Sequence, residues 1–376
     1  MFQTNLTIAG RSVVAEIHDD PHLDEAAVVW LFTDFPMKPA DLTDLMAAYD
    51  DGAITIGFGG GPLDEHPQSG EARRNGVCAA TLAADFIGDP VIDDQAAMDV
   101  VDFVCRRDTN VRTRDGSYYD LSSMMKEMNR RGLPPEQVVA WGIEGLRAAY
   151  NGRKAYWATA AEIKEKGTIT TIPAPVGEAD RQILVIVSDN PHVKDFAFNE
   201  LNVAVVVQQQ ATGQLQGNVQ IFTNHECQVD MDDVTTVLRY QEQMFHLDFQ
   251  GRPPVTDWKV LRNDGMFPDP ENPDHDELRG MPPWYYFRRG RMVLNGSETH
   301  PDLPATQIPL ERIADTVAKC LDPTYFEESK CEDCLAGKCT AGRGNGERCR
   351  LYTWGLKRCR TLRYQQTKAA QGGDNN

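Results

Sequence analysis

Two short segments near the N-terminus carry the residue types best suited to metal chemistry. Residues 18–25 read HDDPHLDE and residues 59–66 read GGGPLDEH. Five of their residues are the candidate metal ligands, namely His18, His22, Asp24, Asp64 and His66. Imidazole and carboxylate ligands in one set suit manganese, zinc or iron better than magnesium alone. Either segment by itself is usually a solvated turn or a helix cap, but the two together predict a metal site.

Strands that end side by side are needed to bring these segments together. Residues 11–17 are expected to form a strand that ends before His18, and residues 54–61 a strand that runs into the glycine turn. Residues 24–34 should form a helix with Asp24 near its start. Further helices are expected over residues 41–48, 78–88, 94–106, 119–131 and 135–150. Alternating strands and helices predict an α/β fold, a parallel sheet with helices on both faces, which binds ligands beyond the carboxyl ends of its strands.

The spacing of these residues resembles the first motif of the DHH phosphoesterase superfamily. That motif has a histidine, an acid four residues later and an aspartate six residues later. The set His18, His22 and Asp24 matches it, except that His22 stands where the family has an acid. The closest motif likeness is to the melanocyte-proliferating-gene branch, whose His-x-Asp-Glu is similar to residues 22–25. Residues 64–66, Asp-Glu-His, resemble the Asp-His-His triplet with one substitution.

Two further parts of the superfamily pattern have counterparts here, and one does not. The helix after the triplet packs against the sheet in the family, and residues 78–88 resemble it. A fourth metal-binding aspartate follows in the family, which we match to Asp108 ahead of Asp102 and Asp99. The aspartate that ends the second strand of the family is missing, because ITIGFGG contains none. A degenerate or one-metal site is therefore an alternative to two metals.

The resemblance implies a hydrolase in which two divalent cations, Mn²⁺ or a similar ion, lie about 3.5–4 Å apart and activate water against a phosphodiester. Its implied metal ligands are His18, His22, Asp24, Asp64, His66 and Asp108. Direct catalytic roles are assigned to His18, Asp64 and His66, with His66 either a ligand or the acid toward the leaving group. Glu25 and Glu65 either orient the ligands or are ordinary turn and helix-start acids. The expected substrate is a nucleotide or a short oligonucleotide.

Members of the superfamily carry a smaller second domain that grips the substrate, and residues 180–322 have the corresponding place and size, after a linker near 167–180. The expected elements are strands over 182–189, 202–210 and 213–223, helices over 229–245 and 310–321, and a hairpin over 284–300. Polar residues of the hairpin are the substrate-binding candidates, namely Arg288, Arg289, Arg291, Asn295, Ser297 and His300. The alternative is a charged hairpin surface. The aromatic row Trp284–Phe287 either stacks on bases or packs in the core.

A third candidate site lies near the C-terminus, where five of the nine cysteines follow one another at short spacing. They are Cys331, Cys334, Cys339, Cys349 and Cys359. Such clustering without a secretion signal indicates metal ligation rather than disulfides. Zinc is preferred, an iron–sulfur cluster is the alternative, and neither is a third outcome. The first four cysteines are the preferred ligands, with Cys359 as a spare or substitute.

The cysteines define a predicted module over residues 323–368, with a disordered tail over 369–376. A segment this short usually needs a metal or crosslinks to fold. Residues 331–368 hold nine Lys/Arg against three Asp/Glu, and their basic and aromatic side chains suit a nucleic acid or an acidic protein partner. They could equally dock on the acidic body of the same chain. The predicted domains are thus 1–165, 180–322 and 323–368.

Charge and composition limit the function further. The net charge is −18, and because residues 331–368 are basic, the first 330 residues carry −23. Such a body repels long polyanions, although bound cations reverse the field locally. No apolar run is long enough to predict a membrane span, and no secretory signal is recognised, so a cytoplasmic location is expected. The competing functions are a non-catalytic DHH-like protein that docks a nucleic acid or protein through its Cys-rich tail, and a hydrolase of another bond.

Overall fold

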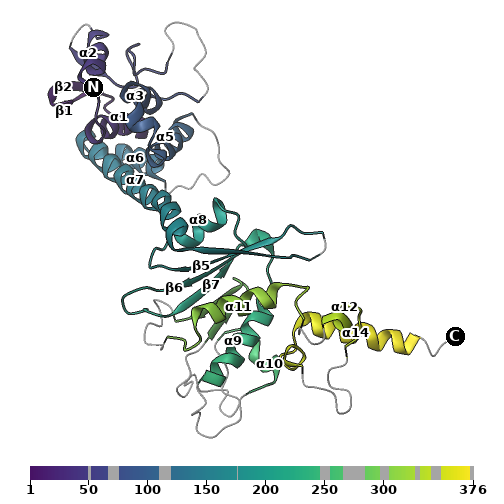
Figure 1. Ribbon diagram of the computed structural model, residues 1–376. Helices are drawn as coiled ribbons and strands as arrows, with labels where there is room; N and C mark the ends of the chain where they lie inside the picture. Colours follow the sequence, from purple (N-terminus) through teal and green to yellow (C-terminus); the bar gives the residue numbers. More distant parts are fainter. Residues whose placement is uncertain are drawn as a thin grey trace. The chain divides into compact units, whose positions relative to one another are not determined.

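The computed structural model describes residues 1–49, 52–66, 76–109, 120–175, 177–245, 255–265, 284–296, 305–326, 331–339 and 349–372. The chain divides into two compact units, unit 1 over Met1–Ala158 and unit 2 over Thr159–Asn376 (Figure 1). Helix α7 (Pro135–Lys166) runs across that division. We expected the boundary between residues 165 and 180, and the division instead falls within this helix.

Unit 1 contains a small mixed sheet of three strands in the order β1-β2-β3. Strands β1 (Phe2–Ile8) and β2 (Arg11–Ile17) form an antiparallel hairpin, and β2 pairs in parallel with β3 (Ala53–Thr55). The turn at Ala9 and Gly10 has positive φ at both residues, as tight hairpin turns require. The expected parallel sheet with helices on both faces is therefore only partly found, because an unpredicted edge strand pairs antiparallel. The strand expected over 54–61 is also shorter.

Seven helices are described in unit 1 or begin there. They are α1 (Leu23–Asp34), α2 (Pro39–Ala47), α3 (Ala79–Ile87), α4 (Asp89–Ile92), α5 (Gln95–Asp108), α6 (Leu121–Arg130) and α7. Helix α1 lies at the centre, where it contacts β1, α3, α5 and α6, and ten of its twelve residues are buried. Asp94 and Asp120 cap the N-termini of α5 and α6 through backbone N–H groups. Helix α7 continues well beyond the expected end at residue 150.

Unit 2 contains a mixed sheet of six strands in the order β4-β5-β6-β7-β9-β8. Its strands are β4 (Thr168–Ile172), β5 (Arg181–Val187), β6 (Val205–Gln209), β7 (Val219–Thr223), β8 (Trp284–Phe287) and β9 (Met292–Asn295). Only β5 and β6 pair in parallel, and the other neighbours are antiparallel. Residues 168–172 were expected to be linker, but they form the edge strand β4. The hairpin expected over 284–300 is found as β8 and β9.

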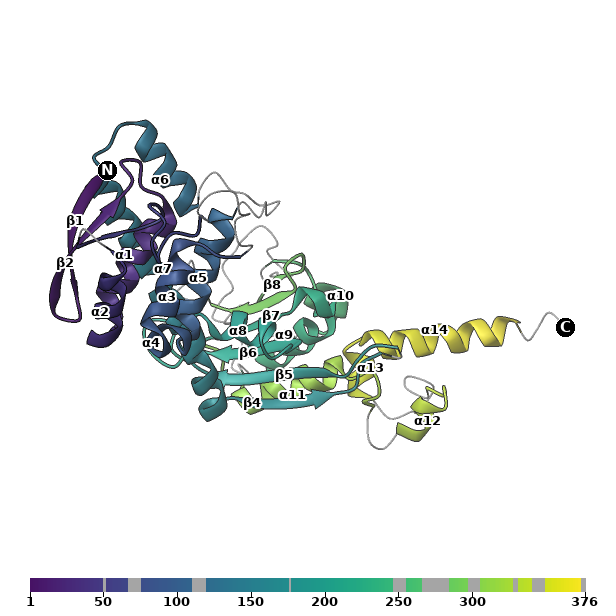
Figure 2. The ribbon, with the colours of Figure 1, turned by 90° about the horizontal axis from the view of Figure 1, so that it is seen from above.

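Helices lie on both faces of this sheet. The helical elements described in unit 2 after α7 are α8 (Val193–Asn199), the 3-10 turn η1 (His225–Cys227), α9 (Asp232–Phe245), α10 (Trp258–Leu261), α11 (Leu310–Leu321), α12 (Cys331–Leu335), α13 (Arg350–Thr353) and α14 (Lys357–Gly372). Helix α8 lies on one face of the sheet, and α9 and α11 lie together on the other (Figure 1). Figure 2 shows α14 extending beyond the strands of unit 2. Both units are thus mixed α/β.

The C-terminal residues do not form the self-contained module that we expected over 323–368. Leu351, Leu356 and Cys359 are buried in the same hydrophobic core as Val237 of α9 and Ile313 of α11. Apolar side chains of the segment are covered by the rest of unit 2 rather than by one another. The prediction of a disordered tail over 369–376 is wrong for its first residues, because α14 continues to Gly372. Residues 373–376 lie outside the described residues. In the described part of the chain, no helix has the length and apolar character needed to cross a membrane.

Candidate metal centre

Three carboxylates from different parts of unit 1 converge on one point. They belong to Asp24 in the first turn of α1, Glu65 in the loop after β3 and Asp108 at the end of α5, and one oxygen of each lies within 4.8 Å of the others. Asp24 is 4% exposed and Glu65 is 7% exposed. Carboxylates gathered this closely away from water repel one another unless a proton or a cation separates them. The group is therefore a candidate cation site.

The electrostatics of Asp24 point the same way. Burial raises the pKa of Asp24 well above its ordinary value, and the charges of Asp108, Glu25 and Glu65 raise it further. Its Oδ1 atom is buried and accepts no hydrogen bond from any residue that the structure describes. A buried acceptor without a donor costs about 1–3 kcal/mol, and a cation at this position would remove that cost. The donor set fits a divalent ion that accepts oxygen and nitrogen ligands.

A cavity of about 390 Å³ opens beside these acids. Its lining includes the three carboxylates together with His18, His22, Glu25, Gly57, His66, Arg107, Ser122 and Lys126. Five of the six predicted metal ligands thus line one cavity, and Asp64 is the exception. The two loops that follow β2 and β3 bring the histidines there, because these parallel strands end at the same edge of the sheet.

Glu25 holds the two histidines of the first segment in place. Its Oε1 atom accepts a hydrogen bond from His18 Nδ1 at 2.5 Å, and its Oε2 atom accepts one from the backbone N–H of His22 at 2.6 Å. With Nδ1 engaged, Nε2 is the nitrogen that His18 can offer to an ion, the arrangement that orients many metal-bound histidines. Of the two alternatives for Glu25, the contacts favour an orienting role.

Gly57 makes room for that carboxylate. It has a φ of 77°, and a Cβ atom at this position would lie 3.4 Å from Glu25 Cγ and 3.5 Å from Glu25 Oε1. A side chain there would be strained by the backbone and would press on the group that orients His18. This glycine, two residues after the end of β3, therefore belongs to the support of the site.

Asp64 is used differently from what we expected. Its Oδ2 atom accepts a hydrogen bond from Gly60 N at 2.7 Å, and its Oδ1 atom accepts from His66 N at 2.8 Å. These bonds tie the glycine loop together, and it is the next residue, Glu65, that reaches Asp24 and Asp108. Asp64, Glu65 and His66 form a second group of three with ligand atoms within 4.8 Å. Asp64 can still contribute to an ion there.

Positively charged side chains of the cavity were not among the sequence candidates. Arg107 precedes Asp108 on α5 and is ion-paired with Asp120, the cap of α6. Lys126 is exposed on α6, one turn after Ser122, and the two residues line the same wall. The spacing of Ser122 and Lys126 places them on one helix face, but nothing in the sequence showed which face meets the acids.

The predicted substrate residues of unit 2 mostly make structural contacts. Arg288 Nε pairs with Asp232 at 3.1 Å, and Arg291 Nη2 donates to Gln228 Oε1 at 2.5 Å. Asn295 is fully buried. Arg289 is exposed, and Ser297 and His300 lie outside the described residues. In the aromatic row, Trp284 and Tyr286 are core residues while Tyr285 and Phe287 face outward, as strand alternation requires.

The five C-terminal cysteines are all free thiols. Cys331 and Cys334 lie on α12 and are half-buried, whereas Cys339, Cys349 and Cys359 are buried. Within the described residues, no three of these sulfur atoms lie within 4.8 Å of one another. The thiols are thus neighbours in the fold without forming a closed ligand shell.

Comparisons with known proteins place no further constraint on either site. No protein-family model, no curated protein and no solved structure matches the chain.

Proposed function

We propose that unit 1 is a metal-dependent phosphodiesterase that acts on nucleotides or short oligonucleotides. The observation that carries the proposal is the group formed by the buried Asp24 and Glu65 with the half-buried Asp108, in a cavity that His18 and His22 also line. Two imidazoles and three carboxylates around one cavity are ligands for manganese or a similar divalent ion. The likeness of the same residues to the DHH motifs favours phosphoester chemistry over other uses of such an ion.

The side chains have distinct parts in the proposed reaction. Asp24, Glu65 and Asp108 hold one or two divalent ions, with His18 and His22 completing the shells. Bound ions supply a hydroxide near neutral pH and neutralise charge on the phosphoryl oxygens. Glu25 orients His18 from behind. To His66, which is exposed and contacts Asp64, we assign the transfer of a proton to the leaving oxygen.

Substrate binding is assigned to the basic side of the same cavity. Arg107 of α5 and Lys126 of α6 line the same cavity as the three carboxylates. Guanidinium and ammonium groups bind phosphate oxygens by charge-assisted hydrogen bonds. The body of the chain carries −23 over residues 1–330, so long duplexes are repelled at a distance while short substrates reach the cavity. Short oligonucleotides should therefore turn over faster than long duplexes at low salt.

Two matched pairs of variants test the assignment. In the first, Asp108→Asn should lower Mn²⁺-dependent hydrolysis of dinucleotides and of bis(p-nitrophenyl) phosphate by at least about 100-fold, because a ligand is lost. Asp102→Asn is its control, since Asp102 lies on the same helix, is 67% exposed and pairs only with Arg106 among the described residues. Equal activity of the two variants would remove Asp108 from the site.

The second pair separates the neighbouring acids of the loop. Glu65→Gln should weaken Mn²⁺ binding, measured by isothermal titration, much more than Asp64→Asn, because only Glu65 joins Asp24 and Asp108. The reverse order would return the ligand role to Asp64. Tight Mn²⁺ binding by the wild-type chain with no hydrolysis of any phosphodiester would instead favour the non-catalytic alternative.

A further inference from the structure

The cysteine segment of unit 2 has no part in the proposed hydrolysis, and its contacts differ sharply along its length. Helix α12 carries Cys331 and Cys334, and Cys339 follows it. Cys349 directly precedes α13, and Cys359 lies in the first turn of α14. The two later helices are attached firmly to unit 2, whereas α12 is not.

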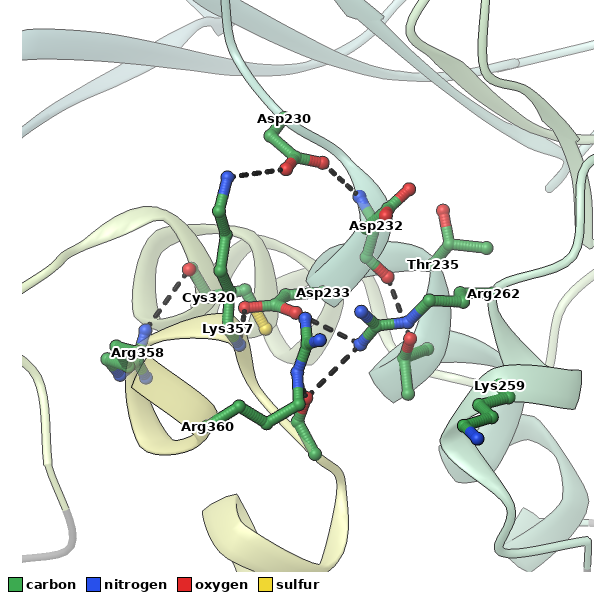
Figure 3. A network of polar contacts seen from close by, with 12 residues as sticks. Asp230, Asp232, Asp233, Thr235, Lys259, Arg262, Cys320, Lys357, Arg358 and Arg360 are labelled. Atoms are coloured by element: carbon green, nitrogen blue, oxygen red, sulfur yellow. Dashed lines mark hydrogen bonds and ion pairs between the residues drawn. The ribbon is translucent and has the colours of Figure 1, made fainter. Parts of the chain in front are cut away.

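A buried polar network attaches the start of α14 to α9 (Figure 3). Asp233 Oδ2 accepts a hydrogen bond from the backbone N–H of Lys357 at 2.8 Å, and Asp233 Oδ1 accepts one from Arg262 Nη2 at 3.2 Å. Arg262 Nη2 also donates to Gly355 O at 3.2 Å, and Lys357 Nζ pairs with Asp230 at 3.2 Å. Because the network lies between Cys349 and Cys359, it fixes both thiols on the body of unit 2.

Close packing reinforces this attachment. Arg262 and Arg360 each place the guanidinium carbon 4.4 Å from the centre of the Trp258 ring. A Cβ atom on Gly355 would lie 2.5 Å from Trp258 Cγ, so the turn between α13 and α14 presses directly on α10. Leu351 and Leu356 are buried beside it. The position of Cys359 is therefore set by the core of unit 2.

Helix α12 lacks any comparable support. It has five residues, none of them buried, and its only large apolar side chain, Leu335, is 62% exposed. Its end is tied to α14 by a hydrogen bond from Gln366 Nε2 to Gly337 O at 2.6 Å. One turn of helix is unstable by itself in water, and apolar burial does not hold this one. Among the residues that the structure describes, the thiols are therefore the groups left to attach α12 to the rest of the segment.

The thiols lie near enough to influence one another. Burial raises the pKa of Cys334, and the neighbouring Cys339, Cys349 and Cys331 raise it further. Burial raises the pKa of Cys359 to about 12, although the charge of Arg358 lowers it. The neighbouring Cys349, Cys334 and Cys339 raise this pKa further. Geometry singles out the same thiols, because Cys339, Cys349 and Cys359 are buried together in the hydrophobic core of unit 2, whereas Cys331 is the first residue of α12, a helix with no buried residue. This differs from the sequence expectation, in which Cys359 was the spare.

We propose that Cys334, Cys339, Cys349 and Cys359 bind one tetrahedral zinc ion that fastens α12 to α13 and α14, and that Cys331 stays outside the shell. Four thiolates form a closed structural zinc set, and the four-residue gap between Cys334 and Cys339 is within the range of such sites. Binding Zn²⁺ releases one proton from each thiol and leaves a centre of charge −2. The nine Lys/Arg of residues 331–368 provide the compensating charge. Because the sulfur atoms are still apart, zinc binding draws α12 inward.

Metal content of the purified full-length chain tests the ligand set. Inductively coupled plasma mass spectrometry should find one zinc per chain, and no inorganic sulfide should be released on acid treatment. Cys334→Ser and Cys359→Ser should each reduce the zinc content to near zero. Cys331→Ser, the same substitution in the same helix as Cys334, should keep it. Loss of zinc in Cys331→Ser with retention in Cys359→Ser would overturn the proposed set, as would iron with sulfide or the absence of metal.

A second measurement avoids variants that fail to fold. With zinc bound to the wild-type chain, iodoacetamide should modify Cys331 while Cys334, Cys339, Cys349 and Cys359 are protected, as mapped by mass spectrometry. Chelation should then open Cys334 to alkylation, since it is the half-buried ligand. Equal protection of Cys331 and Cys334 before and after chelation would contradict the proposal. Neither measurement uses hydrolysis, so the result is independent of the function proposed for unit 1.

Discussion

Asp24 stands out among the individual residues because the fold gives its charge so little support. Its carboxylate is buried against Glu65 and Asp108, and Oδ1 accepts no hydrogen bond within the described part of the chain. Glu25, the next residue, is equally buried but accepts hydrogen bonds from His18 and His22. Two adjacent acids therefore differ in role: Glu25 is satisfied by protein donors, while Asp24 is left for a cation.

This contrast predicts an unusual dependence of stability on pH in the metal-free protein. The folded-state pKa of Asp24 lies above its ordinary value of 3.8, so the folded chain binds a proton more tightly than the unfolded chain. The stability that this provides is present at low pH and is lost as pH rises through the folded pKa. In EDTA, Asp24→Asn should therefore melt a few degrees above wild type at pH 8, and the difference should shrink as pH falls toward 4.

Thermal melts of both proteins across that pH range check this expectation. Adding Mn²⁺ should raise the melting temperature of the wild type and leave that of Asp24→Asn nearly unchanged. Parallel pH profiles in EDTA would mean that Asp24 does not carry the buried charge.

At the level of elements, one arginine joins a helix, a loop and a strand of unit 2. Arg239 on α9 is buried and donates to the carbonyl oxygens of Leu261, Asn263, Gly265 and Trp284, at distances between 2.6 and 3.1 Å. Burial lowers the pKa of Arg239 to about 9, which keeps the guanidinium charged at neutral pH. The side chain thus supplies donors to four backbone carbonyls, of which the Gly265 carbonyl also accepts a hydrogen bond from Tyr286 N at 2.8 Å.

Replacing Arg239 should therefore be costly. Arg239→Met should lower the free energy of unfolding by about 3–5 kcal/mol, because each buried carbonyl left without a donor costs about 1–3 kcal/mol. Urea denaturation of the full-length chain measures it. Arg312→Met is the control, since Arg312 is exposed on α11 and its guanidinium lies over the Phe245 ring, so a change below about 1 kcal/mol is expected. Similar losses in both variants would contradict the bonding role of Arg239.

On the scale of the whole molecule, the chain has two separate hydrophobic cores. The buried residues of the first run from Leu6 to Leu146, and those of the second from Ile172 to Cys359. The three converging acids and their cavity belong wholly to the first. Unit 1 therefore contains all the described parts of the candidate metal centre.

A fragment of residues 1–158 should consequently fold alone and bind Mn²⁺ with the stoichiometry of the full chain. Circular dichroism should show a single cooperative melt. Isothermal titration should give a Mn²⁺ affinity within about threefold of that of the full-length chain, because no metal ligand is lost. With RT about 0.59 kcal/mol, a threefold change is a small difference in binding free energy. A fragment of residues 1–134, which lacks α7 and with it Val138, Val139 and Leu146 of the core, is the control and should not fold. Failure of the longer fragment to bind metal would place part of the site in unit 2.

Much of the local structure followed from sequence patterns. Strand β2 alternates Val13, Ala15 and Ile17 on its buried side, so its end at His18 was predictable. The helices of unit 1 were expected near their actual places because their apolar residues recur at helical spacing. Strand β4 was missed because four of its five side chains are exposed, so it lacks the apolar alternation that signals a half-buried strand. Strand β1 does alternate, with Leu6 and Ile8 buried between exposed residues, and its pattern could have been recognised in the sequence.

The sequence by itself determined which residue types gather in unit 1 and which cysteines cluster in unit 2, because composition and spacing are local properties. Only the tertiary structure decided that Glu65 rather than Asp64 meets Asp24 and Asp108, and that Cys359 is buried with Cys339 and Cys349 while Cys331 is not. Adjacent residues in a turn point in different directions, and the backbone of that turn is set by distant packing. Which neighbour faces a site is therefore a long-range outcome that residue spacing does not contain.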